Sequence, residues 1–399
     1  MSLRCLLISP QAENGEKPAG GEDTFTKMLL RYPPAGIEYI YYKDLVRAGA
    51  ATRLWLGPKV LLRCTPLWSL SPDIWLEFFD TRLSFDLIHI HGYSVWLSRR
   101  FRRSLRKRRT PIVMSTSSSS AYDLVGYLSW PERLARRAFA VKKLVFKSLG
   151  IYDHHVNFPE GSVQLVWSEF AKRLHGSWGP PKKIVVIPPP VELPPLANGP
   201  RQGDTCRLLF VGADFERKGG DILLEAYREV KQKMPQVELL IVGPPQHVLK
   251  EPIAGVRCIT WLPMERLHKE IFPNADVFVL PSRAEGYGMS VVEAMAHAIP
   301  VVASSIGALP EIIRDRVDGY LVPPGDVPSL RDAILALVGD AQMRTAMGRT
   351  ARARVQHHLS VAAFQTRLGE LYQSILGVRT RNDVTTDRRL VDGFTRAEP

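Results

Sequence analysis

Cysteine is scarce in this sequence of 399 residues: it has four, and no two of them form a CxxC pair. Cys5, Cys64, Cys206 and Cys258 lie far apart, and three of them stand in apolar stretches typical of strands. This distribution argues against a disulfide scaffold and against a zinc site. It favours buried, reduced thiols in a cytoplasmic protein.

A hydrophobic run long enough to cross a bilayer is also missing. The longest uncharged stretch, 294–310, is interrupted by two prolines and a glycine, so it does not form a spanning helix. The N-terminal segment MSLRCLLISP holds only a short apolar run, which predicts a first strand rather than a signal peptide. Any contact with a membrane is therefore expected to be peripheral, on its inner face.

Positive charge, in contrast, is in excess. Lys and Arg outnumber Asp and Glu by 53 to 40, a net charge of +13. Residues 1–200 hold 28 basic against 16 acidic residues, a net of +12, whereas 201–399 hold 25 against 24, a net of +1. Nucleic acid, an anionic membrane surface and an acidic polymer are all partners that the basic first half would suit.

Apolar runs and helical patterns alternate in the second half, which predicts a parallel sheet with helices on both faces. The expected strands are 207–211, 238–242, 256–259, 276–280, 300–303 and 320–322. The first half repeats this order less cleanly. Its expected strands are 3–9, 37–42, 86–90, 111–115, 162–166 and 183–187. The fold class is therefore α/β.

Proline marks the middle of the chain, because 188–204 holds five prolines in its first eight residues. We interpret this segment as a linker between two Rossmann-like, doubly wound domains, at 1–190 and 205–358. A helix at 361–376 is expected to return to the first domain, and 377–399 to form a loose tail. Such folds bind ligands at the carboxyl ends of their strands, so we expect the two sheets to face a central cleft.

A glycine loop follows the strand at 207–211 and leads into a helix. Glycines such as Gly212 allow close backbone approach, a helix N-terminus offers free N–H groups, and Arg217 and Lys218 add two positive charges. These features suit a phosphate. The alternative is a solvated Arg–Lys pair in a surface loop. No GxxxxGK[ST] motif occurs, so a P-loop NTPase is not indicated.

A second glycine loop, 281–290, follows the strand at 276–280. Glu285 lies in this loop, and Glu293 lies eight residues later in the helix that follows. Two carboxylates at one rim can accept hydrogen bonds from sugar hydroxyls. The alternative is local, because Ser290 and Glu293 have the spacing of a capping box, in which Glu293 only satisfies the helix end.

The segment EGYGMSVVEAMA, with Glu285 and Glu293 in an E-x7-E pattern, resembles the retaining GT-B glycosyltransferases of family 4. The segments FVGADFERKGGDILLEA, ADVFVLPSRAEG, AIPVVAS, GALPEII and DGYLVPPGD follow the order and spacing of that family. The similarity is strong over 207–376. In the first half it is weaker and rests on Gly20 and Gly21, FDLIHIHG, PIVMST, VWSEFAKR and IVVIPPPVE.

This resemblance implies transfer of a hexosyl group from a UDP- or GDP-sugar to a hydroxyl acceptor, with retention of configuration and without a metal or a cofactor. It implies that Glu285 contacts the donor sugar, that Glu293 holds the ribose hydroxyls, and that Arg217 and Lys218 face the diphosphate. The other residues that it places near the donor are Gly20, Gly21, Gly212, Gly286, Tyr287, Gly288 and Met289.

Two positions depart from the family pattern. Ala213 stands where the family often has Arg, which removes one phosphate contact. Ser117 stands where the family usually has His, at the end of the P-x-V-x-T-x-H run, so this position lacks an imidazole near the sugar. His91, at the end of a strand, is a further candidate in the first domain, and a histidine of the core is the alternative.

Basic residues concentrate in 99–109, where eight of eleven residues are Arg or Lys. The pattern in 130–149 predicts a basic amphipathic helix, and 55–79 adds five aromatic residues. The apolar stripe of this helix comprises Leu134, Ala138, Val141, Val145 and Leu149. This combination suits an anionic membrane interface and an acceptor that is lipid-linked or a cell-surface glycan precursor. The alternative is a stripe that packs on the sheet while the charges face water.

Three other functions compete with hexosyl transfer. A sugar-nucleotide epimerase or a glycan phosphorylase would keep the fold, although a phosphorylase needs a pyridoxal lysine for which the sequence has no distinct signal. A nucleic-acid-binding protein is supported by net charge alone, because no RNP, KH or helix-turn-helix signature occurs. We therefore expect no nucleic-acid partner.

Overall fold

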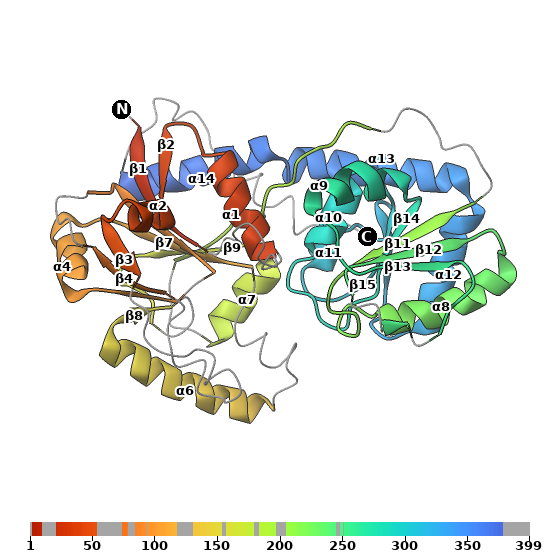
Figure 1. The fold of residues 1–399 in the computed structure, drawn as a ribbon, viewed down its shortest axis with the longest axis horizontal. Helices are drawn as coiled ribbons and strands as arrows, with labels where there is room; N and C mark the ends of the chain where they lie inside the picture. The colour runs from red at the N-terminus through yellow and green to blue at the C-terminus, as the bar shows by residue number, and fades with distance from the viewer. Residues whose placement is uncertain are drawn as a thin grey trace. The chain divides into compact units, whose positions relative to one another are not determined.

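The computed structural model describes residues 2–9, 21–53, 74–78, 84–92, 94–117, 131–153, 157–178, 183–196, 205–244, 248–249 and 251–377. The chain divides into two compact units. Unit 1 comprises Met1–Pro188 and Phe364–Pro399, and unit 2 comprises Pro189–Ala363. In Figure 1 the first part of unit 1 runs from red to yellow, and unit 2 runs from yellow-green to blue.

Unit 1 is built on a parallel sheet of six strands in the order β10-β9-β7-β5-β1-β2. The strands are β1 (Leu3–Ile8), β2 (Ile37–Tyr41), β5 (Leu87–His91), β7 (Ile112–Thr116), β9 (Val163–Val166) and β10 (Lys183–Val186). All strands expected in the first half are confirmed, with ends that differ by one residue. The central strands β5 and β7 are buried along their whole length, as parallel strands covered on both faces are.

Unit 1 also contains a small sheet of four strands that the sequence does not predict. Its order is β3-β4-β6-β8, with β3 (Ala51–Arg53), β4 (Ile74–Phe78), β6 (Val95–Leu97) and β8 (Ile151–Tyr152). β4 pairs with β6 in parallel, and the other two pairs are antiparallel. Strands of two to five residues are too short for a clear alternation of apolar and polar positions.

Helices flank the two sheets of unit 1 (Figure 1). They are α1 (Gly21–Arg31), α2 (Tyr42–Arg47), α4 (Arg99–Arg108), α6 (Glu132–Leu149), α7 (Glu169–Trp178) and most of α14 (Val361–Leu376). α4 begins at Ser98, whose Oγ accepts a hydrogen bond from the N–H of Phe101 at 3.3 Å. α6 ends at Gly150, which has a φ of 66°, the left-handed conformation common after a helix.

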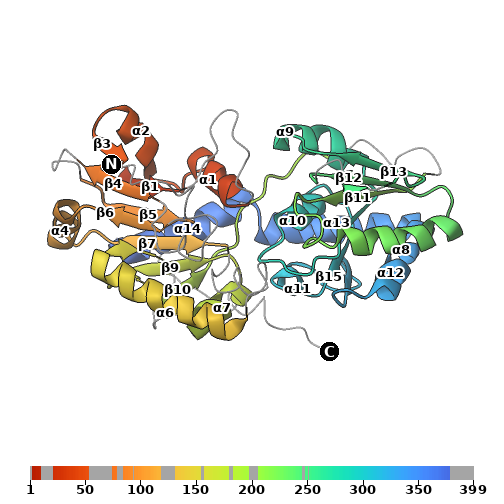
Figure 2. The same cartoon turned by 60° about the horizontal axis from the view of Figure 1, so that its bottom comes forward.

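Helix α14 brings the end of the described chain back to its beginning. The ring of Phe364, which is 1% exposed, lies 5.6 Å from the ring of Phe25 in α1. Further along, the hydroxyl of Tyr372 lies 2.9 Å from that of Tyr39 in β2. Figures 1 and 2 both show the blue α14 beside the red strands of unit 1. The helix expected at 361–376 is thus confirmed.

Unit 2 contains a second parallel sheet of six strands, in the order β13-β12-β11-β14-β15-β16. The strands are β11 (Arg207–Val211), β12 (Glu238–Val242), β13 (Val256–Ile259), β14 (Val277–Leu280), β15 (Val301–Ser304) and β16 (Gly319–Val322). All six expected strands are confirmed. β14 and β15 are fully buried, so they form the centre of this core.

The helices of unit 2 are α8 (Gly220–Lys233), α9 (Met264–Arg266), α10 (Met289–Ala296), α11 (Leu309–Ile312), α12 (Val327–Gly339) and α13 (Ala341–His358), with the short turns η4 (Leu267–Ile271) and η5 (Phe272–Asn274). Asp326 and Asp340 cap α12 and α13 through their side chains. The start of the proline-rich segment also packs on this unit, because the N–H of Val191 donates to the carbonyl of Leu359 at 2.9 Å. Of the helices that the structure describes, none has the length and apolar character needed to cross a membrane.

Candidate functional site

Two loops of unit 2 meet at the carboxyl edge of its sheet: one joins β11 to α8, and the other joins β14 to α10. Gly219 has a φ of 72°, and a Cβ at this position would lie 1.9 Å from the carbonyl oxygen of Pro281. Only glycine therefore allows this approach. The N–H of Arg283 also donates to the carbonyl of Arg217 at 2.8 Å. The two predicted glycine loops thus form one surface.

The centre of this surface is an ion pair between Lys218 Nζ and Glu285 Oε2. The two side chains are only 15% and 8% exposed. The hydroxyl of Ser282 lies 3.5 Å from the same carboxylate oxygen. A carboxylate this deeply buried is stabilised by a paired cation, so each loop depends on the other for its charge balance.

Arg217 is fixed across the same two loops. Its Nε donates to Asp214 Oδ2 at 2.7 Å, and its Nη1 donates to the carbonyl of Ala284 at 3.0 Å. Its side chain is 21% exposed. The alternative of a solvated Arg–Lys pair is therefore wrong, because both cations are held against the second loop. Ala213, where the family often has Arg, is exposed.

Helix α10 begins directly after Gly288, which has a φ of 100°, and no side chain caps it. The capping-box alternative is therefore wrong: Gly288 turns the chain before Ser290, so Ser290 stands inside the first turn. Glu293 is 5% exposed. Burial raises the pKa of its carboxyl to about 8, although the charge of Lys218 acts in the opposite direction. Near neutral pH this carboxyl is mostly protonated, so it can donate as well as accept a hydrogen bond.

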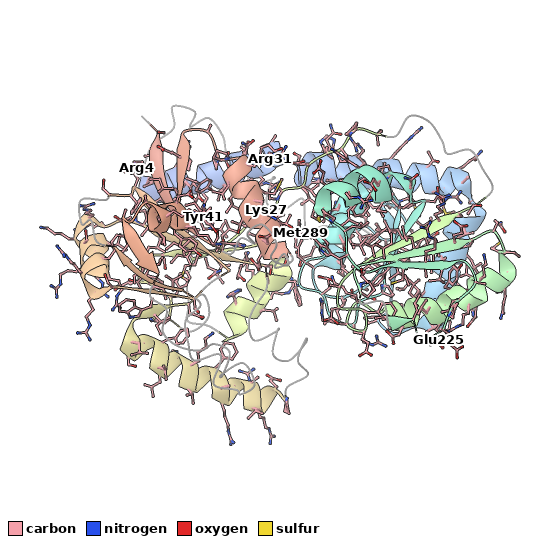
Figure 3. The ribbon with its side chains drawn as sticks, viewed as in Figure 1. Arg4, Lys27, Arg31, Tyr41, Glu225 and Met289 are labelled. Atoms are coloured by element: carbon pink, nitrogen blue, oxygen red, sulfur yellow. The ribbon has the colours of Figure 1, made fainter. Side chains whose placement is uncertain are left out.

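The remaining predicted donor residues of unit 2 line the same edge. Gly286, Tyr287 and Gly288 are buried, whereas Gly212 and Met289 are half-buried. Figure 3 marks Met289, the first residue of α10. The structure thus gathers Arg217, Lys218, Glu285 and the start of α10 in one place, at the end of the sheet where doubly wound folds bind ligands.

The predicted residues of unit 1 meet through a residue that the sequence analysis missed. Ser117 follows β7 and His91 ends β5, so both lie at the carboxyl edge of that sheet. Glu22, in the first turn of α1, joins them: its Oε1 accepts hydrogen bonds from Ser117, and its Oε2 pairs with His91 Nε2. Gly21 is the first residue of α1, and Gly20 lies outside the described residues.

His91 is 0% exposed. Its ring stacks on that of Trp167 at 5.9 Å and lies 4.4 Å from the ring of Phe25. The structure therefore places its imidazole in the interior, with Nε2 aimed at Glu22. One signal could have pointed to Glu22: it follows the double glycine at a helix start, where an acid is favoured.

Among the residues that the structure describes, no three His, Cys, Asp or Glu side chains gather as a metal site would require.

The family model of glycosyl transferases group 1 matches residues 205–340. The D-inositol 3-phosphate glycosyltransferase of Mycobacterium leprae is 33% identical over 394 residues, which cover 88% of this chain and 86% of that protein. This chain belongs to the group 1 glycosyl transferases. The resemblance to the GT-B enzymes of family 4 is thereby confirmed.

Other relatives of this group 1 glycosyl transferase match over shorter regions. The D-inositol 3-phosphate glycosyltransferase of Segniliparus rotundus is 32% identical over 190 residues, 42% of either chain. The phosphatidyl-myo-inositol mannosyltransferase of Mycobacterium leprae is 38% identical over 157 residues, 38% of this chain and 41% of that protein. The matched part thus spans less than half the length of these two relatives.

Solved structures show the fold of this group 1 glycosyl transferase. A glycosyltransferase of Rickettsia africae has a TM-score of 0.65 at 16% identity and covers 95% of this chain and 100% of its own. Anabaena HepE in complex with UDP and glucose has a TM-score of 0.62 at 16% identity, covering 94% of this chain and 100% of its own. These likenesses confirm the GT-B α/β class.

Proposed function

We propose that this group 1 glycosyl transferase moves a hexosyl group from a UDP- or GDP-sugar to a hydroxyl acceptor, with retention of configuration. The observation that carries the proposal is the pair of Lys218 and Glu285. It places a cation and a carboxylate together between two glycine loops, next to the N-termini of α8 and α10. Free N–H groups and the positive end of a helix suit a diphosphate, and a carboxylate suits sugar hydroxyls.

Each residue then has a chemical task. Lys218 and Arg217 stabilise the negative charge that develops on the leaving nucleoside diphosphate. Glu285 contacts the donor sugar near its reacting face. Glu293, kept mostly neutral by burial, exchanges hydrogen bonds with the ribose hydroxyls. No step in this scheme requires a metal ion or a cofactor.

The names of similar proteins support both proposed substrates, the hydroxyl acceptor and the nucleotide-sugar donor. All three relatives described above carry inositol in their names, two as D-inositol 3-phosphate and one as phosphatidyl-myo-inositol. The HepE structure holds UDP and glucose. A hydroxyl acceptor and a UDP-sugar donor agree with these names.

A panel of UDP-, GDP- and ADP-hexoses tests the proposal. We expect slow release of a nucleoside diphosphate from one of them in the absence of acceptor, and a released hexose with the donor's anomeric configuration in its first NMR spectrum. A free sugar with an inverted ring carbon would favour the epimerase instead. Formation of a sugar phosphate from a glycan and inorganic phosphate would favour the phosphorylase, and no release at all would refute the transferase.

We further propose that the protein is cytoplasmic, that unit 1 lies on an anionic membrane, and that the acceptor is lipid-linked or a cell-surface glycan precursor. Helix α6 supports this, because Leu144, Val141 and Leu134 are 72%, 52% and 51% exposed. Only Ala135, Phe139 and Phe146 of this helix are buried. Of the five residues of the predicted stripe, Leu134, Val141 and Leu149 are therefore exposed, whereas Ala138 and Val145 are half-buried. Arg133, Arg136, Lys143 and Lys147 are exposed beside them.

Helix α4 adds charge to the same part of unit 1. Its buried side chains are Phe101 and Leu105, and it has no acid in its first turn. Arg102 Nη1 donates to the carbonyl of Gly150 at 3.0 Å, so α4 contacts the end of α6. A cationic helix next to a helix with exposed leucine and valine is typical of a membrane-surface element. The aromatic segment 55–79 lies largely outside the described residues.

A further inference from the structure

Ser117 is one position at which this chain departs from its family, and the structure shows what holds its hydroxyl. The N–H and the Oγ of Ser117 both donate to Glu22 Oε1, at 3.1 and 2.5 Å. The other oxygen of Glu22 pairs with His91 Nε2. An ionised carboxylate only accepts hydrogen bonds. The proton of the Ser117 hydroxyl is therefore committed to Glu22, and only lone pairs of Oγ are left for another partner.

The carboxylate is kept ionised by its neighbours. Burial alone would raise the pKa of Glu22, but the charge of His91 and the hydrogen bonds from His91 and Ser117 lower it to about 2. An ionised Glu22 has no proton to give, so it acts as an acceptor toward Ser117 and as a negative charge beside His91. At neutral pH Ser117 is therefore the donor and Glu22 the acceptor in both of their hydrogen bonds.

A buried network fixes the imidazole of His91 from behind. Its Nδ1 lies 2.8 Å from Ser115 Oγ, which lies 2.6 Å from His89 Nε2. The other ring nitrogen of His89 lies 2.6 Å from the hydroxyl of Tyr372 in α14. All four side chains are 0% exposed. Since buried polar groups with satisfied partners hold one geometry, Glu22 has little freedom to turn away from Ser117.

In contrast, the front of this cluster is accessible. Ser117 is half-buried, and the side chain of Glu22 is 24% exposed. Both lie at the carboxyl edge of the sheet of unit 1, the edge at which doubly wound folds bind ligands. Figure 3 marks Lys27 and Arg31 further along α1, the helix that begins at this edge.

We propose that Ser117 Oγ accepts a hydrogen bond from a sugar hydroxyl of the substrate, and that Glu22 and His91 are positioning residues that keep it an acceptor. This inference rests on the proposed function and deepens it. An imidazole N–H at this position can donate to an ether, a carbonyl or a phosphate oxygen, whereas Ser117 cannot. The bound group must therefore donate a hydrogen bond, which a free sugar hydroxyl does and an ether, carbonyl or phosphate oxygen does not.

Kinetics with UDP-hexoses, GDP-hexoses and their monodeoxy analogues test this selection. Ser117→Ala should lower kcat/KM for the intact sugar about 3- to 10-fold, the size of one neutral hydrogen bond. It should have no further effect on the one analogue that lacks the bonded hydroxyl. Ser117→Thr should retain the activity. If the hydroxyl belongs to the donor, the loss appears in hydrolysis without acceptor; if it belongs to the acceptor, the loss appears only in transfer.

Glu22→Gln and a matched control test the positioning role. In Glu22→Gln the ¹⁵N signals of the His91 ring should shift and the discrimination between the intact sugar and the sensitive analogue should fall. Glu132→Gln makes the same substitution in the first turn of α6, where the carboxylate pairs with Arg136 at the surface, and should change neither. Unchanged His91 signals in Glu22→Gln would disprove the pairing.

The outcomes separate this inference from the proposed function. Suppose that the wild-type protein releases a nucleoside diphosphate, but that the loss in kcat/KM from Ser117→Ala is the same with every deoxy analogue as with the intact sugar. Ser117 then binds no sugar hydroxyl, so the inference is wrong while the proposed function stands. If the wild-type protein turns over none of these donors, the function fails and the inference falls with it.

Discussion

Lys218 and Glu285 are 67 positions apart in the chain, yet they form a single ion pair with little exposure to water. Each comes from a glycine loop behind a different strand of unit 2, so the pair exists only when β11 and β14 lie side by side in the sheet. The same contact that joins the loops also sets the charge of the candidate site. Folding of this sheet and assembly of the site are therefore one event.

Replacing Glu285 by Gln tests this pair directly. The amide keeps the size of the side chain but removes the negative charge, so we expect the fold to persist and turnover of the donor to fall about 100-fold or more, the scale on which a site carboxylate usually acts. Steady-state kinetics and circular dichroism measure the two effects. Glu270→Gln removes a carboxylate from an exposed pair with Arg266 and should leave turnover unchanged. Equal turnover in Glu285→Gln and Glu270→Gln would remove Glu285 from the site.

Glu293 should matter for the nucleotide rather than for the helix. Because Gly288 and not Ser290 begins α10, Glu293→Ala should weaken UDP or GDP binding about 10-fold, as the loss of hydrogen bonds to ribose would. Isothermal titration calorimetry measures this. A lower melting temperature with unchanged nucleotide affinity would show that Glu293 serves only the fold.

The buried carboxyl of Glu293 also predicts how stability depends on pH. Its pKa rises from 4.5 to about 8 on folding. Between these pH values the folded state holds a proton that the unfolded state has released, so the free energy of unfolding falls as the pH rises. Glu293→Gln, which resembles the protonated acid, should flatten this fall and melt above the wild-type protein near pH 8. If the melting temperatures of the wild-type protein and of Glu293→Gln change in the same way between pH 4.5 and about 8, the raised pKa of Glu293 is wrong.

The parallel sheets were predictable, because each strand is a compact apolar run between helical patterns and parallel strands are buried on both faces. The small sheet of unit 1 was not, because β3, β6 and β8 have only two or three residues. In the site, Glu285 stood in a recognisable loop. Glu22 did not, since its importance depends on contacts with His91 and Ser117, which are 69 and 95 positions away (91 − 22 and 117 − 22).

Activity should survive chelation by EDTA. Arg217 and Lys218 already lie at the carboxyl edge with the N-termini of α8 and α10, and these groups supply the positive charge that a metal would otherwise bring to a diphosphate. Release of nucleoside diphosphate should therefore be equal with EDTA and with added magnesium or manganese. Complete loss on chelation, restored by either metal, would refute the roles given to Arg217 and Lys218.

Binding of unit 1 to anionic lipid should have a salt-sensitive and a salt-resistant part. The cations of α4 interact with an anionic surface at ~1 kcal/mol each, and salt screens this term. The exposed leucines and valine of α6 would enter the interface through the hydrophobic effect, which salt does not screen. Flotation with vesicles of phosphatidylcholine and phosphatidylglycerol should therefore fall with salt but leave a bound fraction.

Two variants of unit 1 and two control variants of unit 2 separate the salt-sensitive part of lipid binding from the salt-resistant part. The charge variant changes Arg99, Arg100, Arg103 and Arg106 to Ser, and its control changes the exposed Arg228, Lys233, Arg257 and Arg349 of unit 2 to Ser. The apolar variant changes Leu134, Val141 and Leu144 to Gln, and its control changes the exposed Trp261 and Val317 of unit 2 to Gln. We expect the charge variant to lose the salt-sensitive part and the apolar variant to lose the rest, while both controls float as the wild-type protein does. Equal flotation of all five proteins, or flotation of none, would leave the basic helices as a solvated face and favour an acceptor free in solution.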